Sequence, residues 1–308
     1  MSRPLVSIIT PSYNQGVFIE ETIKSVLSQD YSNIEYIVID GGSTDNTVEI
    51  LKKYQTRLRW ISEKDRGQSD AIIKGFGISK GEILAWLNSD DTYLPGAIKT
   101  VVEYFELNPN VAMIYGKTYC TDEDSRVLGE YPTENFDLKT LATCNYISQS
   151  SVFFRRDAYT AAGGVDRELS YTMDYDLWFK MAKRFSVMYC EDFLSCFRLH
   201  RESKTISERH ALAGNKEIVD TVVKHMDWAP LNRVYGYCYQ IVRNLMPAYI
   251  KNLKPLIVLT AIVFTTVKYT ILNRGIRMDD IKLLNFGIIK KLFSGWGSTD
   301  SLREKGRP

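Results

Sequence analysis

Short apolar runs alternate with amphipathic stretches along the first part of the chain. Runs typical of buried strands occupy residues 5–10, 34–39, 58–62, 83–87 and 111–115. Between them, apolar residues recur at helical spacing, as Ile19, Ile23 and Val26 do. Helices are expected over residues 18–29, 44–54 and 69–79, and beyond Pro95, which suits a first helical turn. Repeated strand–helix units predict an α/β fold, a mostly parallel sheet flanked by helices.

The pattern changes after Gly116. Turn residues between short apolar runs predict a hairpin over residues 119–131, and strands are expected at 151–154 and 187–199. A helix is predicted over residues 173–185, and the chain is mainly helical after Glu208. We therefore expect one α/β domain over residues 1–228, with halves 1–115 and 116–228, and a helical C-terminal extension over residues 229–308.

Acidic and amide side chains follow the predicted strands. Asp40 ends the second strand, Asp65 follows the third, and Asn88, Asp90 and Asp91 follow the fourth. In open parallel sheets, ligands bind beyond the carboxyl ends of the strands. Adjacent carboxylates repel each other, and a divalent cation relieves that repulsion. Mg²⁺ and Mn²⁺ both prefer oxygen ligands, so Asp90 and Asp91 are candidate metal ligands.

Two other interpretations of these residues compete with a metal site. Acids after strands can simply cap the following helices, and Asp45 suits that role. A dinucleotide-binding fold needs G-x-G-x-x-G directly after its first strand. Here the first strand leads into residues 10–14, TPSYN, and the G-x-G at Gly75 to Gly77 lies in a helical stretch. A nicotinamide site is therefore disfavoured.

Composition excludes some classes of protein. The chain has 308 residues, 25% of them charged, and a net charge of +2, which predicts no nucleic-acid partner. Its five cysteines form no C-x-x-C pair, which disfavours a disulfide framework or a zinc site. The first residues contain no long apolar run, so we expect no signal peptide and a cytoplasmic location.

The C-terminal segment differs from the rest of the chain. Residues 251–308 carry eleven Lys/Arg and four Asp/Glu, a net charge of +7. Their uninterrupted apolar stretch, residues 255–267, is short of the roughly 20 residues that cross a bilayer. Basic and aromatic residues flank it, which favours peripheral or re-entrant contact with an anionic membrane surface. A helical pair packed on the preceding domain is the alternative.

Three blocks of sequence together resemble the inverting family-2 glycosyltransferases with the GT-A fold. They are TPSYN at residues 10–14, VIDGGSTD at 38–45 and NSDD at 88–91, and the similarity extends over roughly residues 4–205. The resemblance implies a nucleotide-sugar-binding half, 1–115, and an acceptor half, 116–228. It also implies sugar transfer from a nucleotide-sugar to an acceptor hydroxyl. With the membrane-binding segment, it suggests a lipid-linked oligosaccharide acceptor in bacterial cell-surface polysaccharide synthesis, at the cytoplasmic face of the inner membrane.

The resemblance also implies residue roles. The nucleotide-sugar would be bound by six residues: Pro11, Tyr13, Asp40, Asp65, Asn88 and Asp90. Pro11 and Tyr13 would border the base, and Asp40 would accept a hydrogen bond from it. Asp65 would hold the nucleoside. Mn²⁺ or Mg²⁺ would be held by Asp90, Asp91 and His200. Asp174 would be the general base.

Two positions depart from the family pattern. Asn88 replaces the first acid of Asp-x-Asp, which leaves fewer charged ligands, and Met173 stands where many relatives have Glu. Asp176 competes with Asp174 for the base role, although on a helix the two side chains point apart.

The chemistry needs one base on the acceptor hydroxyl and a cation on the leaving diphosphate. A non-catalytic nucleotide-sugar-binding or scaffold protein, or a sugar nucleotidyltransferase, remains as an alternative. The latter needs a glycine-rich basic loop after the first strand, and residues 11–15 are PSYNQ.

Overall fold

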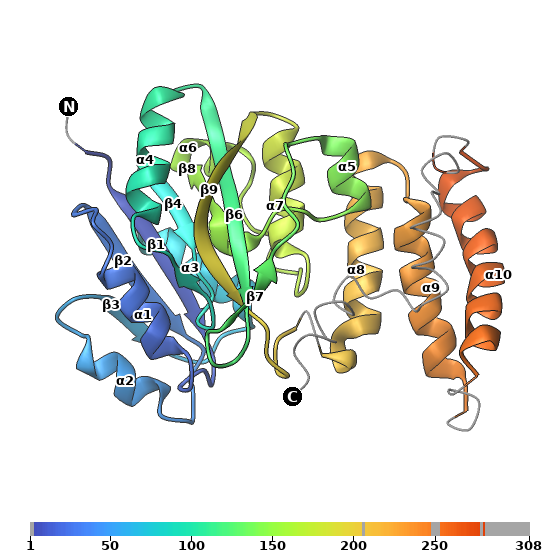
Figure 1. Cartoon of the computed structure of the whole chain (residues 1–308), viewed down its shortest axis with the longest axis horizontal. Coiled ribbons are helices and arrows are strands. Elements are labelled where there is room, and N and C mark those ends of the chain that lie inside the picture. Colours follow the sequence, from blue (N-terminus) through green and yellow to red (C-terminus); the bar gives the residue numbers. More distant parts are fainter. Residues whose placement is uncertain (1–2, 205–206, 248–252, 278–279, 281–308) are drawn as a thin grey trace. The chain divides into compact units, whose positions relative to one another are not determined.

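The computed structural model describes residues 3–204, 207–247, 253–277 and 280, and the chain forms two compact units (Figure 1). The first unit comprises Met1–Leu141 and Asn145–Leu199, and the second comprises Ala142–Cys144 and His200–Pro308. The basic and aromatic residues from 281 onward, part of the predicted membrane-binding segment, lie outside the described residues.

The first unit has the predicted α/β composition. Its strands are β1 (Val6–Ser12), β2 (Ile34–Asp40), β3 (Arg59–Ser62), β4 (Ile83–Trp86), β5 (Thr92–Tyr93), β6 (Val111–Thr121), β7 (Val127–Glu130), β8 (Val152–Arg155) and β9 (Ser186–Arg198). Its helices are α1 (Ile19–Leu27), α2 (Thr47–Lys53), α3 (Gln68–Ile78), α4 (Ala97–Leu107), α5 (Leu138–Thr143, which crosses into the second unit), the 3₁₀ turn η1 (Gln149–Ser151), α6 (Arg156–Ala161) and α7 (Met173–Ala182).

These strands form one mixed sheet in the order β3-β2-β1-β4-β8-β6-β9-β5, with β7 paired to β6. The first four are parallel, as predicted, but β8 runs antiparallel to both β4 and β6. The antiparallel pairing arises because the chain reaches β8 through the β6–β7 hairpin and α5 instead of a strand–helix unit. Strand β6 is continuous from Val111 to Thr121, so the division expected between residues 115 and 116 passes through a single strand.

Helices cover both faces of the sheet. On one face, apolar residues of α1, α2 and α4 pack with Ile8, Val38 and Ala85 of the strands in one cluster. On the other face, Trp86 of β4 contacts rings of α3 and α7, including a stacked contact with Trp178 at 5.6 Å. Every residue of β1 is buried, as expected for a central parallel strand. The sheet thus fixes the carboxyl ends of β1, β2 and β4 side by side.

The second unit is helical, with α8 (Glu208–Met226), α9 (Leu231–Leu245) and α10 (Lys254–Asn273). Val219 of α8 shares a buried cluster with Val234 of α9 and Tyr269 of α10. Because α8 packs its apolar face on α9, it belongs with the C-terminal helices. The division between units therefore falls at residues 199 and 200, and the expected boundary at 228 and 229 is corrected.

Candidate active site

The loops that follow β1 and β2 are bonded to each other. Strand residues Ser12 and Asp40 are partners in the β1–β2 register. Beyond them, the Asn14 amide donates to Ser43 Oγ (2.7 Å), and the Thr44 amide donates to Asn14 Oδ1 (2.9 Å). Asn14 has a φ of 52°, a left-handed conformation that asparagine tolerates. Two segments far apart in sequence therefore form one rigid edge of the site.

Asp40 holds this edge together from inside. Its carboxylate has no exposed surface, and it accepts four hydrogen bonds from the Gly42 and Ser43 amides and the Ser43 and Ser62 hydroxyls. Three of these bonds fall on Oδ2 and one on Oδ1. The side chain therefore supports its own loop, and the expected bond from the base to Asp40 stays a prediction.

Asp65 lies against the same loop with more of its surface open. A Cβ atom on Gly41 would come within 2.9 Å of Asp65 Oδ2, so this glycine leaves the space that the carboxylate occupies. Burial raises the pKa of Asp65, and the bond that its carboxylate accepts from the Gly67 amide (2.8 Å) opposes that shift. Asp65 is therefore the more open of the two acids on this edge, and its expected contact with the nucleoside stays a prediction.

Tyr13 and Pro11 differ in exposure. The Tyr13 side chain is 59% exposed, so its ring is available for stacking. Pro11 is a buried strand residue paired with Ile39. Their expected contacts with the base stay predictions.

The turn after β4 separates the two adjacent acids. Asp91 is 1% exposed, and its Oδ1 accepts from the Arg198 amide at 3.0 Å, while Oδ2 accepts from Asn88 Nδ2 at 3.4 Å. Burial raises the pKa of Asp91 well above its usual range, and the neighbouring charge of Asp90 adds to this rise. Asp90, by contrast, is partly exposed. The pair therefore diverges, which corrects the expectation that both acids bind the metal: Asp91 faces the interior and only Asp90 can present its carboxylate outward.

Other contacts hold the backbone of this turn. Thr22 of α1 donates to the carbonyls of both Ser89 (2.9 Å) and Asp91 (2.7 Å). On the opposite side, Gln68 Nε2 at the start of α3 donates to Asn88 Oδ1 at 2.8 Å. Asn88 is thereby positioned by both α3 and its own turn.

The side chains of this turn suit a metal ion that is bound partly by the protein and partly by a substrate. Over residues 3–204, 207–247, 253–277 and 280, no three His, Cys, Asp or Glu side chains converge to hold a metal ion. Mg²⁺ commonly takes one or two carboxylates and completes its shell with substrate phosphates. Asp90, a single outward acid beside the Asn88 amide, suits that arrangement. His200 belongs to the second unit, where its carbonyl accepts from the Ser203 amide, and its metal role stays a prediction.

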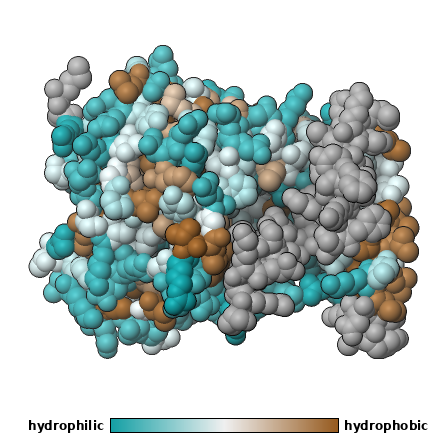
Figure 2. All heavy atoms as spheres, viewed as in Figure 1, coloured by the Kyte–Doolittle hydropathy of each residue, from teal (hydrophilic) through white to brown (hydrophobic). Residues whose placement is uncertain are grey.

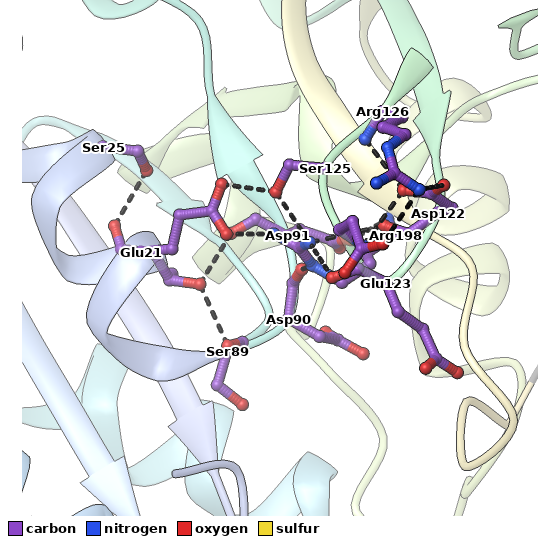
Figure 3. A network of polar contacts seen from close by, with 12 residues as sticks. Glu21, Ser25, Ser89, Asp90, Asp91, Asp122, Glu123, Ser125, Arg126 and Arg198 are labelled. Carbon is purple, nitrogen blue, oxygen red and sulfur yellow. Dashed lines mark hydrogen bonds and ion pairs between the residues drawn. The ribbon is translucent and has the colours of Figure 1, made fainter. Parts of the chain in front are cut away.

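Arg198, which the sequence reasoning did not single out, organises the turn (Figure 3). It is 2% exposed and ends β9. Its guanidinium donates to the Asp90 carbonyl (2.8 Å) and to Glu21 Oε2 (2.6 Å), and also to Ser125 Oγ and the Asp122 and Glu123 carbonyls. An arginine inside an apolar strand is the sequence signal that could have revealed it, because a buried cation needs partners.

Asp174 lies in the first turn of α7 and is partly exposed. The preceding residue, Met173, is buried and its sulfur accepts from the Ser69 hydroxyl of α3 at 3.2 Å. Asp176 has no exposed surface and pairs with Lys180 at 2.5 Å. Asp176 therefore forms a buried ion pair with Lys180. Asp174 is the more exposed acid of this helix and is the one accessible to a substrate.

Helix α3 joins these parts. Its first residue, Gln68, bonds Asn88, and its second, Ser69, contacts Met173 beside Asp174. The β4 turn and the first turn of α7, each with one partly exposed acid, thus both contact the start of α3. Together with the nucleoside edge at β1 and β2, this is the arrangement of a nucleotide-diphospho-sugar transferase with the GT-A fold.

Comparison with known proteins assigns the family. The sequence model described as "Glycosyl transferase family 2" matches residues 7–161, and the chain belongs to this family of glycosyltransferases. An uncharacterized glycosyltransferase of Rickettsia prowazekii is 28% identical over 81% of each chain. The chondroitin synthase of Escherichia coli is 25% identical over 78% of this chain and 37% of its own length.

Solved structures agree on the fold. TarS 1–349 of S. aureus, in complex with UDP-GlcNAc, superposes with a TM-score of 0.58 at 14% identity, covering 88% of this chain and 90% of its own. A mannosyltransferase of Pyrobaculum calidifontis, in complex with GDP-Man and Mn²⁺, gives 0.57 at 15% identity, covering 92% and 89%. The expected fold class and the assignment as a glycosyltransferase are confirmed.

Proposed function

We propose that this glycosyltransferase is inverting and metal-dependent, and that its acceptor is a lipid-linked oligosaccharide in bacterial cell-surface polysaccharide synthesis. We place it at the cytoplasmic face of the inner membrane. The observation that carries the catalytic part is the meeting of the Asn88–Asp91 turn and the Asp174 helix at the start of α3. A diphosphate-binding acid and a base then flank one reacting centre.

The residues divide the work of a direct displacement. Tyr13 and Asp65 bind the nucleoside, and Asp90 faces the diphosphate. Asp174 accepts the proton of the acceptor hydroxyl as its oxygen bonds the anomeric carbon. The bond from that carbon to the diphosphate oxygen breaks on the opposite face, so the anomeric configuration inverts. A bound Mn²⁺ or Mg²⁺ would supply Lewis-acid stabilisation of the charge on the leaving diphosphate.

Ligands of similar proteins support the donor class and the metal. TarS is seen with UDP-GlcNAc, and the Pyrobaculum mannosyltransferase with GDP-Man and Mn²⁺. The name of the E. coli chondroitin synthase supports a polysaccharide product. We extend these to the present chain as a nucleoside diphosphate-sugar donor and a saccharide acceptor.

The metal is tested by titrating Mn²⁺ into the purified protein with a nucleoside diphosphate, followed by electron paramagnetic resonance. We expect tight Mn²⁺ binding in wild type and at least tenfold weaker binding in Asp90→Asn. Asp124→Asn, an exposed acid of the β6–β7 hairpin, is the control and should bind as wild type. Donor turnover should stop in excess chelator. Full turnover without free metal, or equal Mn²⁺ binding by Asp90→Asn, contradicts the proposal.

Product analysis separates the alternatives. Incubation with a panel of nucleotide-sugars should release a nucleoside diphosphate. A sugar nucleotidyltransferase would act on the same nucleotide-sugars only with added pyrophosphate, and would form a nucleoside triphosphate and a sugar 1-phosphate. A non-catalytic binding protein releases neither. Proton NMR of the transfer product should show the anomer opposite to that of the donor. Retention of configuration rules out the single-displacement role of Asp174.

A further inference from the structure

Helix α10 has two apolar faces, and the described chain covers one of them. Ile257, Ala261 and Tyr269, at multiples of four residues, are buried against the neighbouring helices. A second face is open: Val263 is 62% and Ile271 71% exposed. The open face extends from Leu256 through Leu259, Phe264 and Val267 to Ile271, about 22 Å at 1.5 Å per residue. Figure 2 shows apolar surface at the position of α10.

A groove beside this open face is lined by apolar side chains and one lysine. It has a volume of about 410 Å³ and lies between α9 and α10, with Cys238 and Ile241 on one side and Phe264 and Val267 on the other. Lys268 also lines it and places its ammonium 5.0 Å from the centre of the Tyr237 ring. The apolar wall of the groove suits the hydrocarbon chain of a lipid, and its one cation suits the phosphate of that lipid.

The helix is long and apolar enough to cross a membrane, with 28% of its most apolar window buried. Its neighbour decides the orientation, however. Helix α9 carries Arg233, Gln240 and Arg243, and Arg243 pairs with Glu208 of α8 at 3.0 Å. If α10 crossed the bilayer, the helix packed along it would bring these charged and polar side chains into hydrocarbon, which is costly. The open face therefore suits a helix lying in the plane of the interface.

We propose that the open face of α10 and its groove bind an acyl chain of an anionic phospholipid, with Lys268 beside the phosphate. The +7 charge of residues 251–308 favours an anionic surface over a neutral one. This docking gives the proposed enzyme access to an acceptor carried in the membrane, and in that sense it rests on the proposed function. Vesicle binding needs no turnover, so the two proposals fail separately.

Vesicle flotation of the full chain tests the face. Wild type should float with phosphatidylglycerol-containing vesicles and bind neutral phosphatidylcholine vesicles at least fivefold more weakly. The double variant Val263→Asp/Val267→Asp should lose at least tenfold in vesicle affinity. Leu107→Asp, at an 80% exposed position of α4, is the matched control and should float as wild type. Release of nucleoside diphosphate from the donor should be the same in all three.

The groove and its cation are tested separately. In Phe264→Trp, the new indole should be quenched by phospholipids brominated along the acyl chain, beyond the quenching of wild type. Lys268→Glu should weaken binding to anionic vesicles at least fivefold and leave binding to neutral vesicles unchanged. Equal flotation of wild type and double variant overturns the proposal. A wild-type dimer that the double variant Val263→Asp/Val267→Asp dissociates also overturns the proposal, because a second copy of the chain would then occupy the open face.

Discussion

At the scale of single residues, the surroundings of each acid decide its role. Asp90 and Asp91 are neighbours in sequence, yet Asp91 is 1% exposed and bonded within the fold, whereas Asp90 is partly exposed. Asp174 and Asp176 repeat this contrast within one helical turn, where Asp176 is buried with Lys180. Burying an ionised carboxylate is costly unless donors or a cation meet it, so the buried members are structural.

The base is the first residue to test. Asp174→Asn keeps the shape of the side chain and removes its basicity, so turnover should fall on the order of 10²–10⁴-fold. Affinity for the donor, measured by calorimetry, should change little, because the nucleotide contacts come from other strands. Asp176→Asn is the comparison: it should lower the free energy of unfolding by about 3 kcal/mol through the lost pair with Lys180. Near-normal turnover of Asp174→Asn would assign the base elsewhere.

Gly41 offers a test of the nucleoside edge. Gly41→Ala adds a Cβ atom within 2.9 Å of the Asp65 carboxylate and forces that carboxylate to move. Loss of one bond to a charged group costs roughly 1.5 kcal/mol, so nucleoside diphosphate affinity should fall about tenfold. Gly77→Ala, in α3 with nothing within 4 Å of the new Cβ, should leave that affinity unchanged. Calorimetry measures both, and equal affinities would remove Asp65 from the site.

At the scale of elements, one arginine joins segments that the sequence keeps far apart. Arg198 at the end of β9 bonds Glu21 of α1, the Asp90 carbonyl of the β4 turn and the β6–β7 hairpin at Ser125 (Figure 3). Glu21 is about half exposed, while Arg198 is almost fully buried. The arginine therefore depends on backbone carbonyls as much as on the acid, and those bonds set the shape of the turn.

Removing that arginine should destabilise the fold. Arg198→Ala leaves buried carbonyls without donors and should lower the free energy of unfolding by about 3–5 kcal/mol in urea titration. Arg126→Ala removes exposed ion pairs of the same hairpin, to Asp122 and Asp124, and should cost about 1 kcal/mol or less. Similar losses in the two variants would mean that the network does not hold the turn. Arg198→Lys keeps the charge without the planar fork and should fall between them.

At the scale of the whole molecule, the two units carry different parts of the proposed function. The first holds the sheet, the Asn88–Asp91 turn and Asp174, and the second holds the apolar face of α10. Donor chemistry should therefore be independent of a membrane surface, while use of a membrane-borne acceptor should depend on it.

Ionic strength separates the two activities. Raising salt from 0.1 M to 1 M shortens the Debye length from about 10 Å to about 3 Å and weakens attraction to anionic lipid. Transfer to a lipid-linked acceptor in phosphatidylglycerol vesicles should fall severalfold over this range. Hydrolysis of the donor in the absence of vesicles, measured as nucleoside diphosphate release, should change less than twofold. Parallel losses in the two assays would mean that salt acts on the active site and not on docking.

The sequence by itself determined the strands, the helices and the family. Short apolar runs and period-3.6 patterns depend only on local sequence, so β1 to β4 and α1 to α4 were predictable, as was the hairpin at residues 119–131. The three sequence blocks were enough to place the site at the carboxyl ends of β1, β2 and β4. Tertiary structure decided what local patterns do not encode. It set the antiparallel direction of β8 and the membership of α8 in the second unit. It also buried Asp91 against Arg198, which is 107 residues away in sequence. Arg198 shows the reason most directly, since a charge inside a strand acquires its role only when α1, the β4 turn and the hairpin meet around it.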